Sequence, residues 1–470
     1  MSDFSALMDY QSAAETLSAS GLRGELVPRG VSGGFSSVSV DSREAGPGSL
    51  FVALKGAKSD GHRYIADAFR RGAAAALVGR RGIEEAGFRP ESADNVLVVS
   101  DDSLAAFHCL AAAYLDGFPG LLRIGVTGST GKTTVKEIAA AMIGGEKNVF
   151  ANEGNLNSET GLPLSVFSVR ESHEVGIFEA GMNAPGEIES LASVLRPGLA
   201  LVTNIGPAHI GILGSLDAIA SEKKRIFSRF TGTETALIPE DDPFAGFLSG
   251  GIKGNTVLYG QQSLEAKGVL GEIRDRGLAG TEIVWEGIPA VFGLPGKHNV
   301  KNAVAAAAIA LELGISGESV RGGLASVKPL FGRGEILEGK TTVIRDCYNA
   351  NPVSAAEALD FCDGVRWPGR KIYIIGAMLE LGTYSEKAHA ELGKRVAASD
   401  CDMAFFYGKE TAPAAEVLSA KKLPCRYAEG MDDLKEAVSA FVRPGDMILL
   451  KGSRGCALEE LSDIVSMRGN

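Results

Sequence analysis

The chain has 470 residues, 45% of them hydrophobic, and a formal net charge of −11. This length predicts two to four domains with ample material for buried cores, and the acidic balance argues against a general nucleic-acid binder. The first ten residues carry two Asp and no basic residue, and no stretch approaches the ~18 apolar residues of a membrane span. We therefore expect a cytoplasmic protein without a signal peptide or a membrane span.

Glycine is over-represented, because 60 of the 470 residues are glycine, which is nearly twice the usual share of about 7%. No strict Gly-X-Y period appears, which excludes collagen and favours tight turns and close backbone approaches. The six cysteines are scattered without a CxxC pair, and the six histidines show no HExxH spacing. This pattern favours reduced thiols over a disulfide framework or a zinc site.

Three blocks along the chain predict an α/β protein of three domains. The first, 1–100, is predicted to be a smaller N-terminal α/β domain, with a turn-rich stretch before an apolar segment and a strand-like run at Asn95–Val99. A helical pattern at Leu104–Tyr114 then connects it to the second block.

The second block, 101–327, alternates apolar runs with helical patterns. This alternation predicts a parallel sheet with crossover helices, and an Ala-rich helix is expected near its end at Ala303–Leu313. The runs expected to form buried strands are Leu122–Thr127, Val175–Glu179 and Leu199–Ile205.

A glycine loop follows the first of these strands and precedes an amphipathic helix. Strand, loop, Lys-Thr and helix form a phosphate cradle in which backbone N–H groups and the helix N-terminus face the anion. Lys132 can reach the outer phosphates, and the Thr133 hydroxyl can hold Mg²⁺. The common pattern has glycine where Val126 stands, and the alternative is a plain glycine turn. The loop residues are Gly128, Ser129, Thr130, Gly131, Lys132, Thr133 and Thr134.

Two further side chains are expected at the same edge of the sheet. Glu179 ends a predicted strand, where ligands bind in open α/β sheets, so it is a candidate Mg²⁺ ligand. The alternative is a solvated loop acid. His209 follows the next strand, although a lone histidine is more often structural.

Lys223 lies on the apolar stripe of a predicted helix, unlike its neighbour Lys224. A buried lysine needs a partner or a lowered pKa. A neutral amine can react with CO₂ to form a carbamate, which is an oxygen ligand for a metal ion. A snorkelling lysine explains the pattern equally well.

The third block, 328–470, again alternates strand-like runs with helical patterns. It predicts a second doubly wound, Rossmann-like domain. The strand-like runs are Thr342–Asp346, Ile372–Ile375, Met403–Tyr407 and Met447–Leu450.

Several motifs together resemble the Mur ligase family, the ATP-dependent amide-forming ligases of peptidoglycan precursor synthesis. They are TGSTGKTT (127–134), EAGMN (179–183), TNIGPAHI (203–210), GKHNVKN (296–302) and FGRGEI (331–336). Three more motifs resemble the branch that joins D-Ala-D-Ala to UDP-N-acetylmuramoyl-tripeptide: DCYNANP (346–352), GAMLELGTYSEKAH (376–389) and KGSR (451–454). The segment 41–65 is similar to that branch and to the branch that adds the third amino acid.

The resemblance implies a central P-loop ATPase domain that binds ATP and two Mg²⁺ ions. Lys132, Glu179, His209 and Lys223 match catalytic positions, with Thr133 and Glu179 at the first metal, and His209 and a carbamylated Lys223 at the second. Besides the phosphate loop, the residues that match ATP contacts are Asn299, Asn302, Arg333 and Asp346. Taken singly, a helix cap, a surface ion pair and a turn acid explain Asn299, Arg333 and Asp346 equally well.

The same resemblance implies substrate contacts in all three domains. Asp41, Ser42 and Arg43 match a segment near the uridine nucleotide, and Asn157 and Thr160 match a substrate-facing loop. Asn349 and Asn351 match the dipeptide side, although Asn-Ala-Asn-Pro is also a common turn.

The activity implied is amide synthesis through an acyl phosphate, in cell-wall biogenesis and hence in cell shape and division. The expected partners are UDP-N-acetylmuramoyl-tripeptide and D-Ala-D-Ala, with no nucleic acid, and we expect a monomer whose domains close to exclude water. The branch that adds the third amino acid is the nearest rival, but its Asp-Asn-Pro-Arg motif is absent. A P-loop nucleotide switch that binds muramoyl nucleotides is the alternative from another class.

Overall fold

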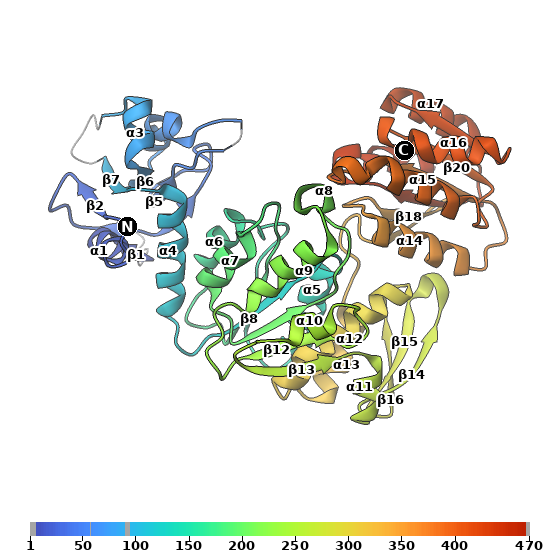
Figure 1. The fold of residues 1–470 in the computed structure, drawn as a ribbon, viewed down its shortest axis with the longest axis horizontal. Coiled ribbons are helices and arrows are strands. Elements are labelled where there is room, and N and C mark those ends of the chain that lie inside the picture. The colour runs from blue at the N-terminus through green and yellow to red at the C-terminus, as the bar shows by residue number, and fades with distance from the viewer. Residues whose placement is uncertain (1–5, 57, 90–94, 467–470) are drawn as a thin grey trace.

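The computed structural model describes residues 6–56, 58–89 and 95–466, and its elements form three groups along the chain (Figure 1). The N-terminal group is a five-stranded sheet in the order β2-β7-β6-β5-β4, with only β2 antiparallel to its neighbour. Its strands are β2 (Glu25–Val27), β4 (Ser37–Ser39), β5 (Ser49–Val52), β6 (Ala75–Gly79) and β7 (Val96–Ser100). The pair β1 (Met8–Asp9) and β3 (Gly34–Phe35) and the helices α1 (Tyr10–Ala19), α2 (Ile65–Arg70) and α3 (Arg80–Ala86) complete it.

Helix α4 (Ser103–Asp116) joins the first group to the second and packs against both. Asp102 caps its first turn by accepting hydrogen bonds from the backbone N–H groups of Leu104 and Ala105, at 2.8 and 3.0 Å. Its buried residues contact α1 and β6 on one side and α6 (Gly161–Val166) and α7 (Glu187–Leu195) on the other. Helix α4 therefore contributes buried residues to the cores of both groups.

The central group contains a six-stranded, fully parallel sheet in the order β13-β12-β11-β8-β10-β9. Strands β8 and β10 are mainly apolar because helices cover both faces of the sheet. The strands are β8 (Leu122–Thr127), β9 (Val149–Ala151), β10 (Val175–Glu179), β11 (Leu199–Val202), β12 (Thr235–Pro239) and β13 (Asn255–Tyr259). The helices are α5 (Lys132–Ile143), α6, α7, α8 (Ile210–Leu213), α9 (Leu216–Lys224), α10 (Ala245–Ser249), α11 (Gln261–Ala266), α12 (Lys297–Glu312) and α13 (Gly317–Ser326).

The predicted strand Leu199–Ile205 is wrong at its end, because β11 stops at Val202. Val202 pairs with Thr127, the last residue of β8, so no ladder partner follows. The chain then turns toward the loop after β8, where Asn204 makes side-chain hydrogen bonds. A small antiparallel sheet, β14 (Leu270–Asp275), β15 (Thr281–Trp285) and β16 (Ile288–Phe292), was not predicted at all.

The C-terminal group is a second six-stranded sheet in the order β17-β18-β22-β19-β20-β21, parallel except for β17. The predicted α/β class, with a Rossmann-like C-terminal domain, is confirmed. Its strands are β17 (Glu335–Glu338), β18 (Thr342–Asp346), β19 (Lys371–Gly376), β20 (Met403–Tyr407), β21 (Cys425–Ala428) and β22 (Met447–Lys451). Its helices are α14 (Pro352–Gly364), α15 (Ser385–Val396), α16 (Ala412–Ala420), α17 (Met431–Phe441) and α18 (Ser462–Ser466).

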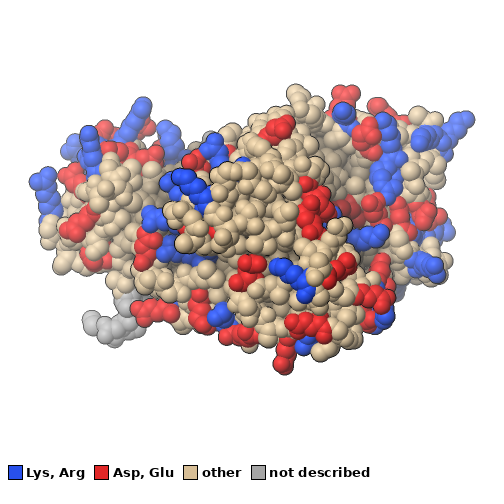
Figure 2. All heavy atoms as spheres, turned by 60° about the horizontal axis from the view of Figure 1, so that its bottom comes forward, with Lys and Arg blue, Asp and Glu red and all other residues tan. Residues whose placement is uncertain are grey.

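Acidic and basic side chains are interspersed over the face of the molecule that Figure 2 shows. An anionic ligand would therefore depend on local groups rather than on a broad basic surface there. Among the residues that the structure describes, no helix is both long enough and apolar enough to cross a lipid bilayer.

The close packing of α13 on α5 generates a stability prediction. A Cβ on Gly323 would lie 2.5 Å from Cα of Met142, whereas a Cβ on the adjacent Gly322 meets nothing within 4 Å. We expect Gly323→Ala to destabilise the central domain by about 1–3 kcal/mol. Gly322→Ala, the matched control, should be neutral or slightly stabilising. Urea unfolding followed by the fluorescence of Trp285 measures both, and equal midpoints would refute the packing argument.

Candidate active site

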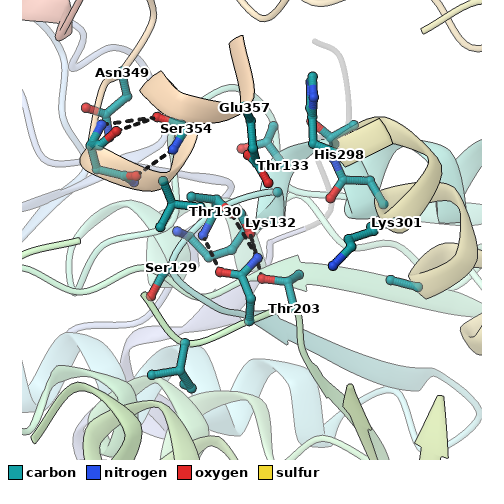
Figure 3. Close-up of a pocket in the computed structure, with 18 of the residues that line it drawn as sticks. Ser129, Thr130, Lys132, Thr133, Thr203, His298, Lys301, Asn349, Ser354 and Glu357 are labelled. Carbon is teal, nitrogen blue, oxygen red and sulfur yellow. Dashed lines mark hydrogen bonds between the residues drawn. The ribbon is translucent and has the colours of Figure 1, made fainter. Parts of the chain in front are cut away.

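A cavity of about 1030 Å³ lies between the central and C-terminal domains. The residues at the carboxyl ends of strands from both sheets line it, including Glu179, Asp346 and Lys451, the last residues of β10, β18 and β22. This is the edge at which open α/β sheets bind ligands. Figure 3 shows Glu357 and His298 entering the cavity from the side opposite Ser129, Thr130 and Lys132.

The loop after β8 has the backbone that a phosphate cradle needs. Gly128 and Gly131 have φ angles of 149° and 78°, and α5 begins directly at Lys132. A Cβ on Gly131 would lie 2.2 Å from Oδ1 of Asn302, so a larger residue there would collide with α12. The loop therefore places backbone N–H groups and a helix N-terminus at the cavity wall.

The segment after β11 holds this loop in place. The backbone N–H of Thr130 donates to Oδ1 of Asn204 at 3.0 Å, and Nδ2 of Asn204 donates to the Thr130 hydroxyl at 2.8 Å. The Thr203 hydroxyl donates to the Thr130 carbonyl at 2.6 Å (Figure 3). Sequence reasoning missed the roles of Thr203 and Asn204, although both belong to the motif TNIGPAHI.

Thr133 and Glu179 meet at the floor of the cavity. The Thr133 hydroxyl donates to Oε2 of Glu179 at 2.7 Å, and Nδ2 of Asn157 donates to Oε1 at 2.6 Å. Glu179 is only 2% exposed. A hydroxyl and a carboxylate beside a phosphate cradle are the oxygen ligands that suit Mg²⁺. Among the described residues no cluster of three or more His, Cys, Asp and Glu could enclose a metal ion, so substrate phosphates and water would have to complete the coordination.

Two lysines converge on one carbonyl oxygen of the loop. Nζ of Lys132 and Nζ of Lys223 donate to the Gly128 carbonyl at 2.9 and 2.8 Å. Lys223 is 2% exposed, so the snorkelling alternative is wrong for this residue. Burial, and then the charge of Lys132, hold the pKa of Lys223 well below its ordinary value. Burial likewise lowers the pKa of Lys132, against the opposing effect of Glu179.

His209 lies at the edge of the cavity, next to a residue of the C-terminal domain. Its Nδ1 is 2.9 Å from Oε2 of Glu380, but the two groups are not aligned for a hydrogen bond, and Nδ1 has no other partner in the part of the chain that the structure describes. The imidazole lowers the pKa of the Glu380 carboxyl group. His209 is thus in place to contact a ligand in the cavity.

On the side of the cavity formed by α12, Asn299 and Asn302 form a short chain of amide contacts. Nδ2 of Asn302 donates to Oδ1 of Asn299 at 3.2 Å, and Nδ2 of Asn299 donates to the Pro295 carbonyl at 2.8 Å. Both residues line the cavity. The hydrogen bond between these two side chains holds them together on the side of α12 that lines the cavity.

The C-terminal domain contributes a second cluster of charged and amide groups. Oδ2 of Asp346 accepts a hydrogen bond from the buried Lys451 at 2.7 Å, and Lys451 also donates to the Asn349 carbonyl at 3.0 Å. The guanidinium of Arg333 stacks 4.1 Å from the centre of the Tyr348 ring. Asn351 caps α14 by accepting from the N–H of Ser354 at 2.9 Å.

Glu357 on α14 also lines the cavity, and sequence reasoning missed it. Burial raises the pKa of its carboxyl group, against the opposing charges of Lys451 and Lys301. It belongs to no motif that marked it in advance. Its place in the cavity depends on the packing of the C-terminal domain against the central domain, which no local sequence pattern indicates.

The cavity does not include every predicted site residue. Thr160 begins α6 beside the cavity without lining it. Asp41, Ser42 and Arg43 lie after β4 in the N-terminal domain, where Arg43 pairs with Asp41 and the Ser42 hydroxyl donates to Asp67. Asp41 keeps a pKa of about 2, chiefly because of its hydrogen bonds from Arg43.

Three family models match consecutive parts of the chain. The Mur ligase family catalytic domain matches residues 35–115, the Mur ligase middle domain 126–310, and the Mur ligase glutamate ligase domain 332–454. The predicted boundary at 327 falls in the gap between the second and third matches, whereas the predicted boundary at 100 lies inside the first match; both remain predictions.

Relatives and solved structures match over nearly the whole chain. The UDP-N-acetylmuramoyl-tripeptide–D-alanyl-D-alanine ligase of Treponema pallidum is 42% identical over 92% of this chain and 94% of its own. A crystal structure of MurF from Acinetobacter baumannii superposes with a TM-score of 0.85 at 27% identity, covering 97% and 98% of the two chains. MurF of Thermotoga maritima, solved in complex with ADP, superposes with a TM-score of 0.76 at 28% identity, covering 92% and 97%.

The lowered pKa of Lys223 predicts a pH-dependent stability. The unfolded chain binds a proton at Lys223 below the ordinary pKa of 10.5, whereas the folded protein binds it only at lower pH. This difference weakens the fold progressively as the pH falls below 10.5. We expect Lys223→Met to raise the melting temperature at neutral pH, by about 2–4 °C for each kcal/mol recovered.

The advantage of the variant should shrink as the pH rises toward 10.5. Lys253→Met, at an exposed lysine of the same domain, is the control and should show no such trend. Melting curves across the pH range check this. A variant that is no more stable than the parent at neutral pH would contradict the burial penalty.

Proposed function

The chain belongs to the Mur ligase family, and we propose that it joins D-Ala-D-Ala to UDP-N-acetylmuramoyl-tripeptide at the expense of ATP. The product is the UDP-N-acetylmuramoyl-pentapeptide of peptidoglycan synthesis. The ligase named in the 42% identical relative and the ADP bound in the Thermotoga structure support this reading. The observation that carries it is the cavity itself, in which a phosphate loop faces a second domain.

The activation step follows from the phosphate side of the cavity. A carboxylate is a poor electrophile because its charge repels a nucleophile. Transfer of the γ-phosphoryl group of ATP to the tripeptide carboxylate gives an acyl phosphate and ADP. Catalysis of such a transfer is mainly positioning and charge neutralisation, for which the loop N–H groups and Lys132 are placed.

The donors around the loop fit two Mg²⁺ ions. Thr133 and Glu179 would hold the first, and His209 with a carbamylated Lys223 would hold the second. When bound, the ions neutralise charge on the phosphoryl oxygens. The buried, unprotonated amine that carbamylation needs is consistent with the lowered pKa of Lys223. Asn157 holds the second oxygen of Glu179, which orients that carboxylate toward Thr133.

The joining step needs the other side of the cavity. The amine of D-Ala-D-Ala attacks the acyl phosphate carbon, and the tetrahedral intermediate collapses with loss of phosphate. Asn349 and Asn351 line this side and are the proposed dipeptide contacts. Arg333, Asp346, Asn299 and Asn302 are the proposed ATP contacts of the nucleoside end. Enclosure between two domains keeps water from hydrolysing the acyl phosphate.

The proposal extends to the nucleotide-linked substrate, the assembly state and the domain boundaries. We assign the uridine nucleotide to the N-terminal domain, near Asp41, Ser42 and Arg43, and the peptide to the loop of Asn157 and Thr160. A nucleotide-linked substrate is consistent with a cytoplasmic enzyme, and we retain the expectation of a monomer. The proposed domains are 1–100, 101–327 and 328–470.

An ADP-release assay tests the function directly. We expect release by the purified protein to require ATP, Mg²⁺, UDP-N-acetylmuramoyl-tripeptide and D-Ala-D-Ala together, because the acyl phosphate turns over only when the amine is present. ADP release is measured with each candidate UDP-N-acetylmuramoyl-peptide, in the presence and in the absence of D-Ala-D-Ala. Release with UDP-N-acetylmuramoyl-dipeptide and a free diamino acid would point to the other branch. Release that needs neither substrate would point to a nucleotide switch.

The proposed carbamate makes a separate prediction. Lys223→Ala should reduce turnover by 100-fold or more, in the range that removal of a catalytic group commonly costs. A short carboxylic acid such as acetate should restore part of it by supplying the missing oxygen ligand. Turnover equal to that of the parent would refute the carbamate, and Lys224→Ala is the control at the adjacent position.

A further inference from the structure

Glu380 is a cavity residue that the proposed reaction does not yet use. It belongs to the segment GAMLELGTYSEKAH of the C-terminal domain, and its Oε2 lies 2.9 Å from Nδ1 of His209 in the central domain. Nδ1 of His209 is buried and has no aligned hydrogen-bond partner among the described residues.

The backbone on both sides of this contact is unusual. His209 and Glu380 have φ angles of 59° and 65°, in the left-handed region that residues other than glycine rarely adopt. Such conformations cost on the order of 1–3 kcal/mol each and persist where the surroundings impose them. Here each of them brings one side chain of the pair to the domain boundary.

The neighbouring contacts make the docking of the two domains specific. A Cβ on Gly211, in α8, would lie 2.4 Å from the backbone nitrogen of Gly382, so the two backbones touch where only glycine fits. Beside them, the Tyr384 hydroxyl donates to the Gly214 carbonyl at 2.9 Å. The position of Glu380 relative to His209 is therefore determined by three contacts, not by one flexible side chain.

We propose that Glu380 is a positioning residue that orients the imidazole of His209 from the opposite domain. In this arrangement the carboxylate accepts the hydrogen bond of Nδ1–H, which leaves Nε2 as the unprotonated nitrogen. That tautomer is the form in which an imidazole binds a metal ion, and carboxylate partners commonly hold it. The metal-binding role of His209 rests on the proposed function, whereas the orientation by Glu380 rests on the contact itself.

This arrangement links domain docking to the completeness of the site. When the C-terminal domain is docked, the carboxylate of Glu380 orients His209. The same docking brings the proposed dipeptide contacts Asn349 and Asn351 to the cavity. When it is undocked, His209 loses its orienting partner. Phosphoryl transfer would then be favoured only when the two domains are docked, which is also the state that protects the acyl phosphate from water.

Nuclear magnetic resonance of the full-length protein labelled with ¹⁵N-histidine tests the proposal without any activity. The chain has six histidines, and His209→Gln identifies the signal of interest. At mildly alkaline pH, where imidazoles are neutral, we expect His209 of the parent to be the Nδ1–H tautomer. Glu380→Ala should shift it toward a mixture of both tautomers, and Glu386→Gln, at an exposed carboxylate nearby, should not.

A second measurement separates positioning from a general structural role. We expect Glu380→Ala to raise the Mg²⁺ concentration that gives half-maximal ADP release by 10–100-fold, the usual effect of losing such a partner. Glu380→Gln keeps an acceptor oxygen and should recover part of that loss. Unchanged signals of the other histidines show that each variant is folded.

An unaltered His209 tautomer in folded Glu380→Ala protein would overturn the proposal, as would an Nε2–H tautomer in the parent. Parent protein that releases no ADP with both substrates would refute the proposed function instead, and the tautomer measurement would still decide the role of Glu380.

Discussion

Two lysine side chains that share one carbonyl acceptor determine how this site must work. Lys132 and Lys223 both donate to the oxygen of Gly128, inside a cavity where water screens little of their mutual repulsion. The repulsion is relieved when an anion approaches Lys132 or when Lys223 is neutral. ATP phosphates would provide the first remedy, and the proposed conversion of Lys223 to a carbamate would provide the second while turning a repelling group into an oxygen ligand. The same geometry that disfavours two ammonium groups therefore favours a polyanionic substrate with metal ions.

The C-terminal domain encloses the phosphate loop, which the central domain does not do by itself. Alone, the central domain presents a phosphate cradle to solvent, and the acyl phosphate formed there would be exposed to water. The C-terminal sheet places the ends of β18 and β22 opposite that cradle, and Asp346, Lys451 and Glu380 line the resulting cavity. The net charge of −11 gives no general attraction for nucleotides, so the binding of two anionic substrates depends on a few local cationic groups, among them Lys132 and Arg333.

The predictable part of the structure is the part in which local pattern and burial agree. Strands β8 and β10 coincide with the mainly apolar runs 122–127 and 175–179, in which Arg123 and Glu179 are the charged exceptions, since both faces of a parallel sheet are covered. By contrast, β16 is an apolar run that exposes Ile288 and Val291 on an edge strand, so its sequence did not distinguish it from a buried strand. Asn204, Glu357 and Glu380 acquire their places only through contacts between segments far apart in the chain. The apolar stripe of its helix marked Lys223, and the family resemblance assigned roles to Lys223 and His209. Neither revealed that Lys223 shares an acceptor with Lys132 or that His209 touches the opposite domain.

The central claim is that this cavity activates a carboxylate by phosphorylation, and oxygen transfer tests it most directly. UDP-N-acetylmuramoyl-tripeptide labelled with ¹⁸O in its terminal carboxylate is turned over with ATP and D-Ala-D-Ala, and the phosphate released is examined by mass spectrometry. An acyl phosphate carries one carboxylate oxygen into the leaving group, so the phosphate should contain one ¹⁸O atom for each amide formed. Unlabelled phosphate, with amide formation intact, would contradict the account.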